Sequence, residues 1–269
     1  MKEFASVCER AARAGGAVLL EKLGQVEARE KGPADLVTEA DLASQEAVRR
    51  VVQEAYPDHE VLGEEGGHEH LTGAAEPSAH RWVIDPLDGT TNYVHGVPHF
   101  CVSLALQRGE ELLAGTVFDP VSGECFSAAA GEGAWLDGRR IRTSGVSACA
   151  AALAATGFPP GATLDAPDVR AFLAALPHCQ SMRRTGSAAL NLAYVAMGRF
   201  DASWSFSTRI WDVAAGILLI REAGGVATRP SGGGFRADSG HFLAASTADL
   251  HGELCRIFVQ AGIVGGDLL

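Results

Sequence analysis

The sequence predicts an α/β protein with mixed sheets covered by helices, built as one compact unit with two halves. Three stretches lead to this fold class. Helical spacing of apolar residues dominates residues 1–55, short strands with turn signals fill the middle, and strands alternate with helices from about residue 151. The 269 residues are enough for one large domain with a sizeable core. We therefore expect a single domain over 1–269, with an N-terminal half of about 1–145 and a C-terminal half of about 146–269.

The N-terminal half begins with two predicted helices. The first has apolar residues at helical spacing, namely Phe4, Val7, Cys8, Ala11, Ala14, Val18 and Leu19. The second runs from about Thr38 to Glu54 and ends at the Tyr-Pro-Asp sequence 56–58. A short strand at 60–65 follows, and the polar, Gly- and His-rich stretch 66–80 is predicted to be a loop. Residues 81–85 (RWVID) form the next predicted strand, and we expect the chain to turn at Pro86 because proline removes a ladder donor.

The remainder of the chain changes its pattern once. Residues 100–141 alternate in period two around turn residues, which predicts an antiparallel meander. Beyond residue 150 we expect strands at 151–158, 178–184 and 202–206, helices at 169–176, 187–197 and 211–223, and a final strand and helix. The change from meander to alternating elements separates the two predicted halves.

Composition disfavours several classes of protein. The formal net charge of −11 argues against general nucleic-acid binding, which needs a basic face. An acidic protein can still bind a phosphorylated metabolite if metal ions lie between the two negative partners. No secretory signal or membrane span is visible, and the six cysteines are scattered without a CxxC pair. We expect a cytoplasmic protein with reduced thiols, without a disulfide framework or a zinc site.

Acidic residues gather where a strand or loop meets a helix. They form four groups: Asp35 and Asp41, Glu64 and Glu65, Asp85 and Asp88, and Asp212. Each group has an ordinary interpretation, because an isolated DxxD is more often a solvated turn, GEE a surface loop, and a single Asp a helix cap. Their joint occurrence is harder to obtain by accident, so we favour a common site. His68 and His70 flank Glu69 close by, but without further ligands at useful spacing we expect no metal site there.

The strand at 81–85 leads into a segment with the composition of a helix N-terminus. Residues 88–92 (DGTTN) offer capping side chains, a permissive glycine and free backbone N–H groups, which attract an anion. Asp85 and Asp88 are thus expected beside a phosphate-ready helix end. Bare carboxylates would repel phosphate, and divalent metals resolve that conflict; hard oxygen ligands suit Mg²⁺. The sequence therefore predicts a joint metal and phosphate site.

Five motifs carry a resemblance to a known family: DLVTEAD (35–41), GEE (63–65), WVIDPLDGTTNYVHG (82–96), GSAALNLAYVAMGRFDASW (186–204) and WDVAAGILLIREAGG (211–225). Over nearly its whole length the chain resembles the inositol monophosphatase family of magnesium-dependent, lithium-sensitive phosphatases. The resemblance implies a layered α/β/α/β/α sandwich of the inositol monophosphatase/fructose-1,6-bisphosphatase type. It also implies two to three Mg²⁺ ions per site and a homodimer.

The resemblance further implies roles for individual residues. The metal ligands would be Glu64, Asp85, the carbonyl of Leu87, Asp88 and Asp212. The catalytic set would be Asp41, Thr90 and Glu64, of which Thr90 and Asp41 position and deprotonate the attacking water. The phosphate would be bound by Gly89 and Thr90. The substrate would contact Asp88, Arg183, Gly186, Ser187, Ala188 and Ser205, with Glu65 and Asp35 supporting the site.

One position departs from the inositol-specific pattern. Inositol-specific members carry a glutamate seven residues before the aspartate that matches Asp212, and this chain has Ser205 there. A neutral hydroxyl can bond a polyol, but the charge-assisted contact is lost. Arg183 and Arg184 have two interpretations: they contact a substrate or dimer partner, or they are a solvated strand end.

The predicted function is a Mg²⁺-dependent phosphomonoesterase that acts on a small polyol or sugar phosphate by metal-activated water attack. Inositol 1-phosphate is the first candidate, histidinol phosphate and fructose 1,6-bisphosphate are alternatives, and adenosine 3′,5′-bisphosphate fits least. A haloacid-dehalogenase-type phosphatase would place its two acids one residue apart, whereas two residues separate Asp85 and Asp88. A non-catalytic sugar-phosphate-binding module is the alternative from a different class.

Overall fold

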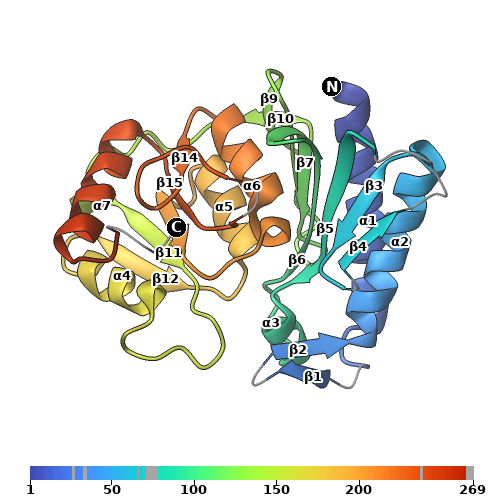
Figure 1. Ribbon diagram of the computed structural model, residues 1–269, viewed down its shortest axis with the longest axis horizontal. Helices are drawn as coiled ribbons and strands as arrows, with labels where there is room; N and C mark the ends of the chain where they lie inside the picture. Colours follow the sequence, from blue (N-terminus) through green and yellow to red (C-terminus); the bar gives the residue numbers. More distant parts are fainter. Residues whose placement is uncertain (26–27, 33–34, 66, 71–77, 237–238, 265–269) are drawn as a thin grey trace.

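Five layers of secondary structure make up the computed structural model of the chain, which describes residues 1–25, 28–32, 35–65, 67–70, 78–236 and 239–264 (Figure 1). From the N-terminal side the layers are a helix pair, an eight-stranded sheet, a second helix pair, a five-stranded sheet and a third helix pair. The pairs are α1 (Lys2–Lys22) with α2 (Glu39–Ala55), α5 (Ala188–Ala196) with α6 (Ile210–Glu222), and α4 (Pro167–Ala175) with α7 (Ala248–Gln260). The layered α/β/α/β/α sandwich predicted from the resemblance is confirmed.

The large sheet contains the predicted meander. Its strands are β3 (Glu60–Gly63), β4 (Gly67–His70), β5 (His80–Asp88), β6 (Cys101–Arg108), β7 (Glu111–Phe118), β8 (Cys125–Ala129), β9 (Gly133–Leu136) and β10 (Arg139–Ile141). Their order is β10-β9-β8-β7-β6-β5-β3-β4, and every pair is antiparallel except β3 with β5. The central strands β6 and β7 are buried on both faces, because α1 packs on one side and α6 on the other.

The expected turn at Pro86 is wrong. Strand β5 continues through Pro86 to Asp88 with a register shift against β6, and the chain turns only at Gly89, before the short helix α3 (Thr90–Val94). Proline lacks a donor but keeps its acceptor, and the carbonyl of Pro86 receives the hydroxyl of Ser44 on α2 at 2.8 Å. The irregular end of β5 therefore remains anchored while its acids face the next layer.

Two further elements differ from the prediction. The stretch 66–80, expected to be a loop, contains β4 and the first residue of β5, while residues 66 and 71–77 lie outside the described part. Strands β1 (Ala28–Gly32) and β2 (Asp35–Thr38) pair as an antiparallel hairpin that the sequence pattern did not predict. Both segments are polar and short, so neither shows the period-two apolar pattern that identifies a strand.

The small sheet follows the predicted alternation of strands and helices. Its strands are β11 (Leu153–Thr156), β12 (Ser181–Arg184), β13 (Ala202–Ser205), β14 (Val226–Thr228) and β15 (Phe242–Ala245), in the order β12-β11-β13-β15-β14. The first three in that order are parallel, and β15 is antiparallel to both of its neighbours. Because α5 follows β12 and α6 follows β13, both central helices start from the same end of these parallel strands.

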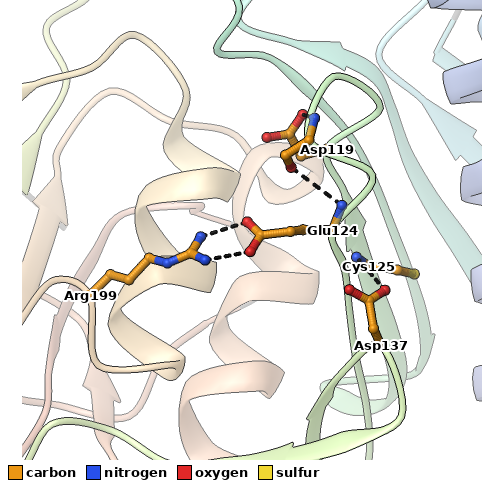
Figure 2. A network of polar contacts seen from close by, with 6 residues as sticks. Asp119, Glu124, Cys125, Asp137 and Arg199 are labelled. Atoms are coloured by element: carbon orange, nitrogen blue, oxygen red, sulfur yellow. Dashed lines mark hydrogen bonds and ion pairs between the residues drawn. The ribbon is translucent and has the colours of Figure 1, made fainter.

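The middle layer joins the two sheets. Helix α6 is buried continuously from Val213 to Ile220, since it lies between the sheets rather than on a surface. A polar network adds a second connection: the guanidinium of Arg199, just after α5, pairs with both carboxylate oxygens of Glu124 between β7 and β8 (Figure 2). Asp119 stabilises the same turn by accepting the backbone N–H groups of Val121 and Ser122. None of the described helices is long and apolar enough to cross a membrane.

Candidate active site

Four helices begin around the end of β5, and their first turns carry most of the predicted site residues. Asp41 lies in the first turn of α2, Thr90 starts α3, Ser187 caps α5, and Asp212 lies in the first turn of α6. A helix N-terminus carries partial positive charge and unpaired N–H groups, so it favours acidic side chains. The arrangement collects acids from both halves of the chain at one place.

Asp85 is a buried acid near the end of β5. Its residue is 2% exposed, and its Oδ1 accepts the backbone N–H of Leu87 at 3.0 Å. Burial raises the pKa of Asp85 well above its usual range, and the neighbouring charges of Glu64, Asp88 and Asp212 raise this pKa further. We refer to these four residues, Glu64, Asp85, Asp88 and Asp212, as the acid cluster.

Asp88 is held by the start of α5. Its Oδ2 accepts the hydroxyl of Ser187 at 2.6 Å and the N–H of Ala189 at 2.7 Å, and its Oδ1 accepts the N–H of Ala188 at 3.2 Å. Burial raises the pKa of Asp88, while these three donors lower it. The residue is only half-buried as a whole, so the carboxyl group lies deep while part of the side chain stays accessible.

Asp212 completes the cluster from the second half of the chain. Its Oδ2 accepts the N–H of Arg209 at 2.7 Å, which caps α6. Burial and the charges of Asp88 and Glu64 raise the pKa of Asp212 to about 8, although the hydrogen bonds from Arg209 and Asp85 oppose the shift. With a pKa of about 8, Asp212 keeps its proton in most metal-free molecules near neutral pH.

The GEE segment is positioned by a residue that the sequence did not reveal. The backbone of Glu65 is bound on both sides by the amide of Gln45 on α2, with Nε2 donating to its carbonyl at 2.5 Å and Oε1 accepting its N–H at 3.1 Å. The N–H of Glu64 donates to the carbonyl of Ile84 on β5 at 3.1 Å. A strand end beside a helix therefore places Glu64 within electrostatic reach of Asp85.

Thr90 and Asp41 are in direct contact. The hydroxyl of Thr90 lies 3.4 Å from Asp41 Oδ1 and 3.1 Å from the carbonyl of Leu87. The other carboxylate oxygen of Asp41 accepts both the backbone N–H and the hydroxyl of Thr38 in a capping box. This carboxylate is 1% exposed and fixed in orientation, with one oxygen directed at Thr90.

Gly89 makes the turn between β5 and α3 possible. Its φ of +97° is a conformation that residues with a Cβ rarely adopt, and an added Cβ would lie 3.0 Å from the carbonyl oxygen of His99. Gly186, with φ of +91°, turns before α5 against Asn92 in the same way. Asn92 ties the two turns together by donating to the carbonyls of His99 and Thr185.

The other predicted substrate residues make contacts of their own. Ser187 and Ala188 bind Asp88, as described above. Ser205 is 3% exposed, and its hydroxyl donates to Asp168 Oδ1 at 3.1 Å. Arg183 is exposed, and its Nη1 donates to Ser181 and Met182 on its own strand. The side chain of Asp35 lies outside the described residues.

Sequence reasoning missed two polar residues that bind predicted site segments, the half-buried Gln45 and the buried Asp168. Gln45 lies on the inner side of α2, where only its position before the GEE strand suggested proximity. Asp168 is 1% exposed at the start of α4 and accepts the N–H of Phe206 at 2.8 Å as well as the hydroxyl of Ser205. The Pro167-Asp168 pair identifies a helix start, but nothing in the sequence shows that its acid binds the end of β13.

The acid cluster has the donor chemistry for a divalent cation. Its oxygen ligands are hard, and their mutual repulsion raises the pKa values of Asp85 and Asp212, as expected for a site that a cation would stabilise. Within the described residues, no three His, Cys, Asp or Glu side chains already form a ready-made ligand group. Asp88, whose two oxygens face α5, would therefore have to turn toward an ion.

A layered α/β/α/β/α sandwich with acids gathered at helix starts defines the phosphatase class to which the sequence motifs pointed. Residues 1–262 match the Inositol monophosphatase family. The chain is 42% identical over 253 residues to Nus factor SuhB of Pseudomonas aeruginosa, covering 92% of this chain and 93% of that protein. It is 43% identical over 220 residues to inositol-1-monophosphatase of Rhizobium meliloti, covering 80% of each.

Solved structures agree with this assignment. The extragenic suppressor protein suhB of Bartonella henselae superposes with a TM-score of 0.89 at 34% identity, covering 98% of this chain and 100% of that one. The chain therefore belongs to the inositol monophosphatase family. This is a family of phosphatases that are generally metal-dependent and act on small phosphorylated substrates.

Proposed function

We propose that the chain is a Mg²⁺-dependent phosphomonoesterase that hydrolyses a small polyol or sugar phosphate, with inositol 1-phosphate as the first candidate. The observation that carries this proposal is the acid cluster, in which Asp85, Asp88 and Asp212 are held close together although burial raises the pKa of all three. Repulsion by neighbouring acids raises the pKa values of Asp85 and Asp212 further. Holding buried acids close together destabilises a fold, and such clusters are typical of functional sites.

The proposed ligand set is the one that membership of the inositol monophosphatase family implies. Glu64, Asp85 and the carbonyl of Leu87 would hold one cation, and Asp85, Asp88 and Asp212 a second one. A bound divalent cation offsets the repulsion between these acids and a phosphate, and lowers the pKa of bound water into a usable range. Mg²⁺ suits this set because all the ligands are hard oxygens.

Thr90 and Asp41 provide a path for one proton. A hydroxyl has a single hydrogen, so Thr90 can donate either to Leu87 or to Asp41. When it donates to Asp41 Oδ1, its oxygen accepts a hydrogen bond from the attacking water, and that proton can pass through Thr90 to Asp41. The rigid capping box keeps Asp41 oriented for this role, and no covalent phosphoenzyme is needed.

The phosphate is proposed to bind at the turn between β5 and α3. Gly89 and Thr90 lie at the N-terminus of α3, and their backbone N–H groups would donate hydrogen bonds to the phosphate oxygens. Without a Cβ, Gly89 allows the close approach of backbone and ligand as well as the turn itself.

One relative and one residue of this chain bear on the choice of substrate. The relative from Rhizobium meliloti is named inositol-1-monophosphatase, which supports inositol 1-phosphate. Ser205 replaces the charged residue of inositol-specific members and binds Asp168, so histidinol phosphate and fructose 1,6-bisphosphate stay as alternatives.

A phosphate-release assay with Mg²⁺ over inositol 1-phosphate, histidinol phosphate, fructose 1,6-bisphosphate and adenosine 3′,5′-bisphosphate tests the proposal. We expect the highest kcat/KM on inositol 1-phosphate and inhibition by millimolar Li⁺. Asp212→Asn should lower Mg²⁺-dependent release by more than about 100-fold, because it removes a metal ligand. Asp249→Asn is the matched control, since Asp249 is an exposed acid in the first turn of α7. Equal activity of the two variants would exclude the metal assignment, and no release from any substrate would favour a binding module.

A further inference from the structure

Two cysteines, Cys149 and Cys179, precede neighbouring strands of the small sheet. Cys149 opens the 3-10 turn η1 (Cys149–Ala151) that precedes β11, and Cys179 precedes β12. These strands are parallel neighbours, with Leu153 paired to Ser181, so both cysteines lie before the same end of the sheet. The N–H of Gln180 donates to the carbonyl of Cys149 at 3.3 Å, which brings the two backbones together.

Their side chains also meet. Cys149 belongs to the hydrophobic cluster under α4 and α7, and Cys179 packs against that cluster. The two thiols are close enough for each to shift the pKa of the other. A disulfide requires two Cα atoms within about 7 Å of each other, and the backbone hydrogen bond beside the pair brings the two segments into this range. Cys149 is 4% exposed, whereas Cys179 is partly open to solvent.

We propose that Cys149 and Cys179 form a reversible intrachain disulfide, with a low-molecular-weight disulfide such as oxidised glutathione as the oxidant. The sulfur of Cys179 attacks the oxidant, forms a mixed disulfide and releases one thiol. Cys149 then attacks the sulfur of Cys179 and displaces the second thiol. Two protein thiols are oxidised to one disulfide, the oxidant is reduced to two thiols, and these carry away the two protons.

The surroundings of the pair give the two sulfurs these different roles. The neighbouring thiol of Cys149 lowers the pKa of Cys179, so the partly exposed cysteine is the one that provides a thiolate. The pKa of Cys149 is raised by the neighbouring Cys179 and by burial. Glu253 on α7 accepts the backbone N–H of Cys149 at 2.7 Å, and its carboxylate is placed to take the thiol proton in the second step.

The crosslink would fasten the end of the α4 region to the beginning of β11. It would close a loop that contains β11 and α4, and thereby restrict the unfolded chain more than the folded one. The inference concerns the small sheet and does not depend on the proposed phosphatase activity.

Treatment of the folded, full-length protein with oxidised glutathione tests the proposal. We expect the mass to fall by that of two hydrogen atoms and the free thiols to drop from six to four, with peptide mapping joining Cys149 to Cys179. The midpoint of thermal unfolding should rise by at least about 4 °C and return on reduction. Cys179→Ser should abolish all these changes, and it replaces the partly exposed partner so that the core is spared.

Cys255→Ser is the matched control. Cys255 is also partly exposed, but its sulfur lies 3.6 Å from His251 Nδ1 and 4.0 Å from the carbonyl of Pro230 rather than beside a cysteine. This variant should oxidise like the wild type. Retention of all six thiols, a persistent glutathione adduct on Cys179, or a disulfide between another pair would each overturn the proposal.

Discussion

At the residue scale, the acid cluster that the proposed function needs also destabilises the metal-free fold. Burial and the neighbouring acids raise the pKa of Asp85 well above its usual range and the pKa of Asp212 to about 8. These side chains are stabilised by helix starts and backbone donors, yet their charges repel one another. The metal-free protein is thus least stable at a pH where Asp85, Asp88 and Asp212 are all ionised.

Asp212→Asn is expected to stabilise the metal-free protein at pH 8 by about 1 kcal/mol. The folded-state pKa of Asp212 lies above the ordinary value of 3.8, so folded chains keep a proton that unfolded chains lose. This contribution to stability is present at low pH and disappears as the pH rises from about 4 to about 8. Urea unfolding in EDTA across that range measures it, and the variant should show the shallower decline. If the free energy of unfolding declined equally in both proteins, the raised pKa of Asp212 would be contradicted.

At the element scale, the sequence predicted the apolar helices and strands well and the polar ones poorly. Helices α2, α5 and α6 lie close to their predicted limits because capping residues and apolar periods coincide there. The hairpin of β1 and β2 and strand β4 escaped prediction because polar strands carry no such period. The prediction at Pro86 failed for a different reason. Proline has no backbone N–H to donate, but its carbonyl still accepts a hydrogen bond, here from the hydroxyl of Ser44 on α2.

The turn between β5 and α3 leads to a prediction about Gly89. Gly89→Ala should destabilise the protein by about 2–3 kcal/mol, because the new Cβ would meet the carbonyl of His99 at 3.0 Å in addition to an unfavourable φ of +97°. Gly96→Ala is the control: its φ is +69°, and nothing lies within 4 Å of the added Cβ. We expect it to lose only about 1 kcal/mol. Chemical unfolding of both variants decides the matter, and similar losses would show that steric contact is unimportant.

A stack of rings at the start of β5 gives a second prediction at this scale. His59 and His80 lie 4.8 Å apart and nearly parallel, and His59 Nδ1 accepts the indole N–H of Trp82 at 3.0 Å. Burial and the neighbouring His80 lower the pKa of His59 below its ordinary 6.5. His59 therefore binds a proton more readily in unfolded chains than in folded ones. The free energy of unfolding should fall as the pH drops below about 6.5.

His80→Gln should make this loss smaller by roughly 0.5 kcal/mol, since it removes the repelling neighbour. The half-buried His99 and the buried His251 also have lowered pKa values and act in the same direction, so the variant is compared with the wild type. Urea unfolding between pH 5 and 8 provides the measurement. His95→Gln, at an exposed position, is the control and should follow the wild type. A variant with an unchanged pH profile would rule out coupling between the two rings.

At the scale of the whole molecule, the candidate site depends on how the two sheets are joined. Asp85 and Asp88 belong to the large sheet, while Asp212 and the donors to Asp88 start helices that leave the small sheet. The sequence indicated which acids would gather at the candidate site, because their motifs are local. It could not indicate that Asp88 would be bound by α5 or that Ser205 would bind Asp168, since these contacts arise only when the layers assemble.

The packing of α5 against α6 is therefore expected to control stability and site geometry together. A Cβ at Gly216 on α6 would lie 2.7 Å from Cδ1 of Leu192 on α5, so Gly216→Ala must push the two helices apart. We expect a loss of about 1–3 kcal/mol and a fall in metal-dependent activity, because both helix starts bind the acid cluster. Gly252→Ala on α7 is the same change in open space and should instead stabilise by about 0.5–1 kcal/mol. Opposite signs in thermal unfolding would establish that close packing of the middle layer, rather than helix propensity, governs this position.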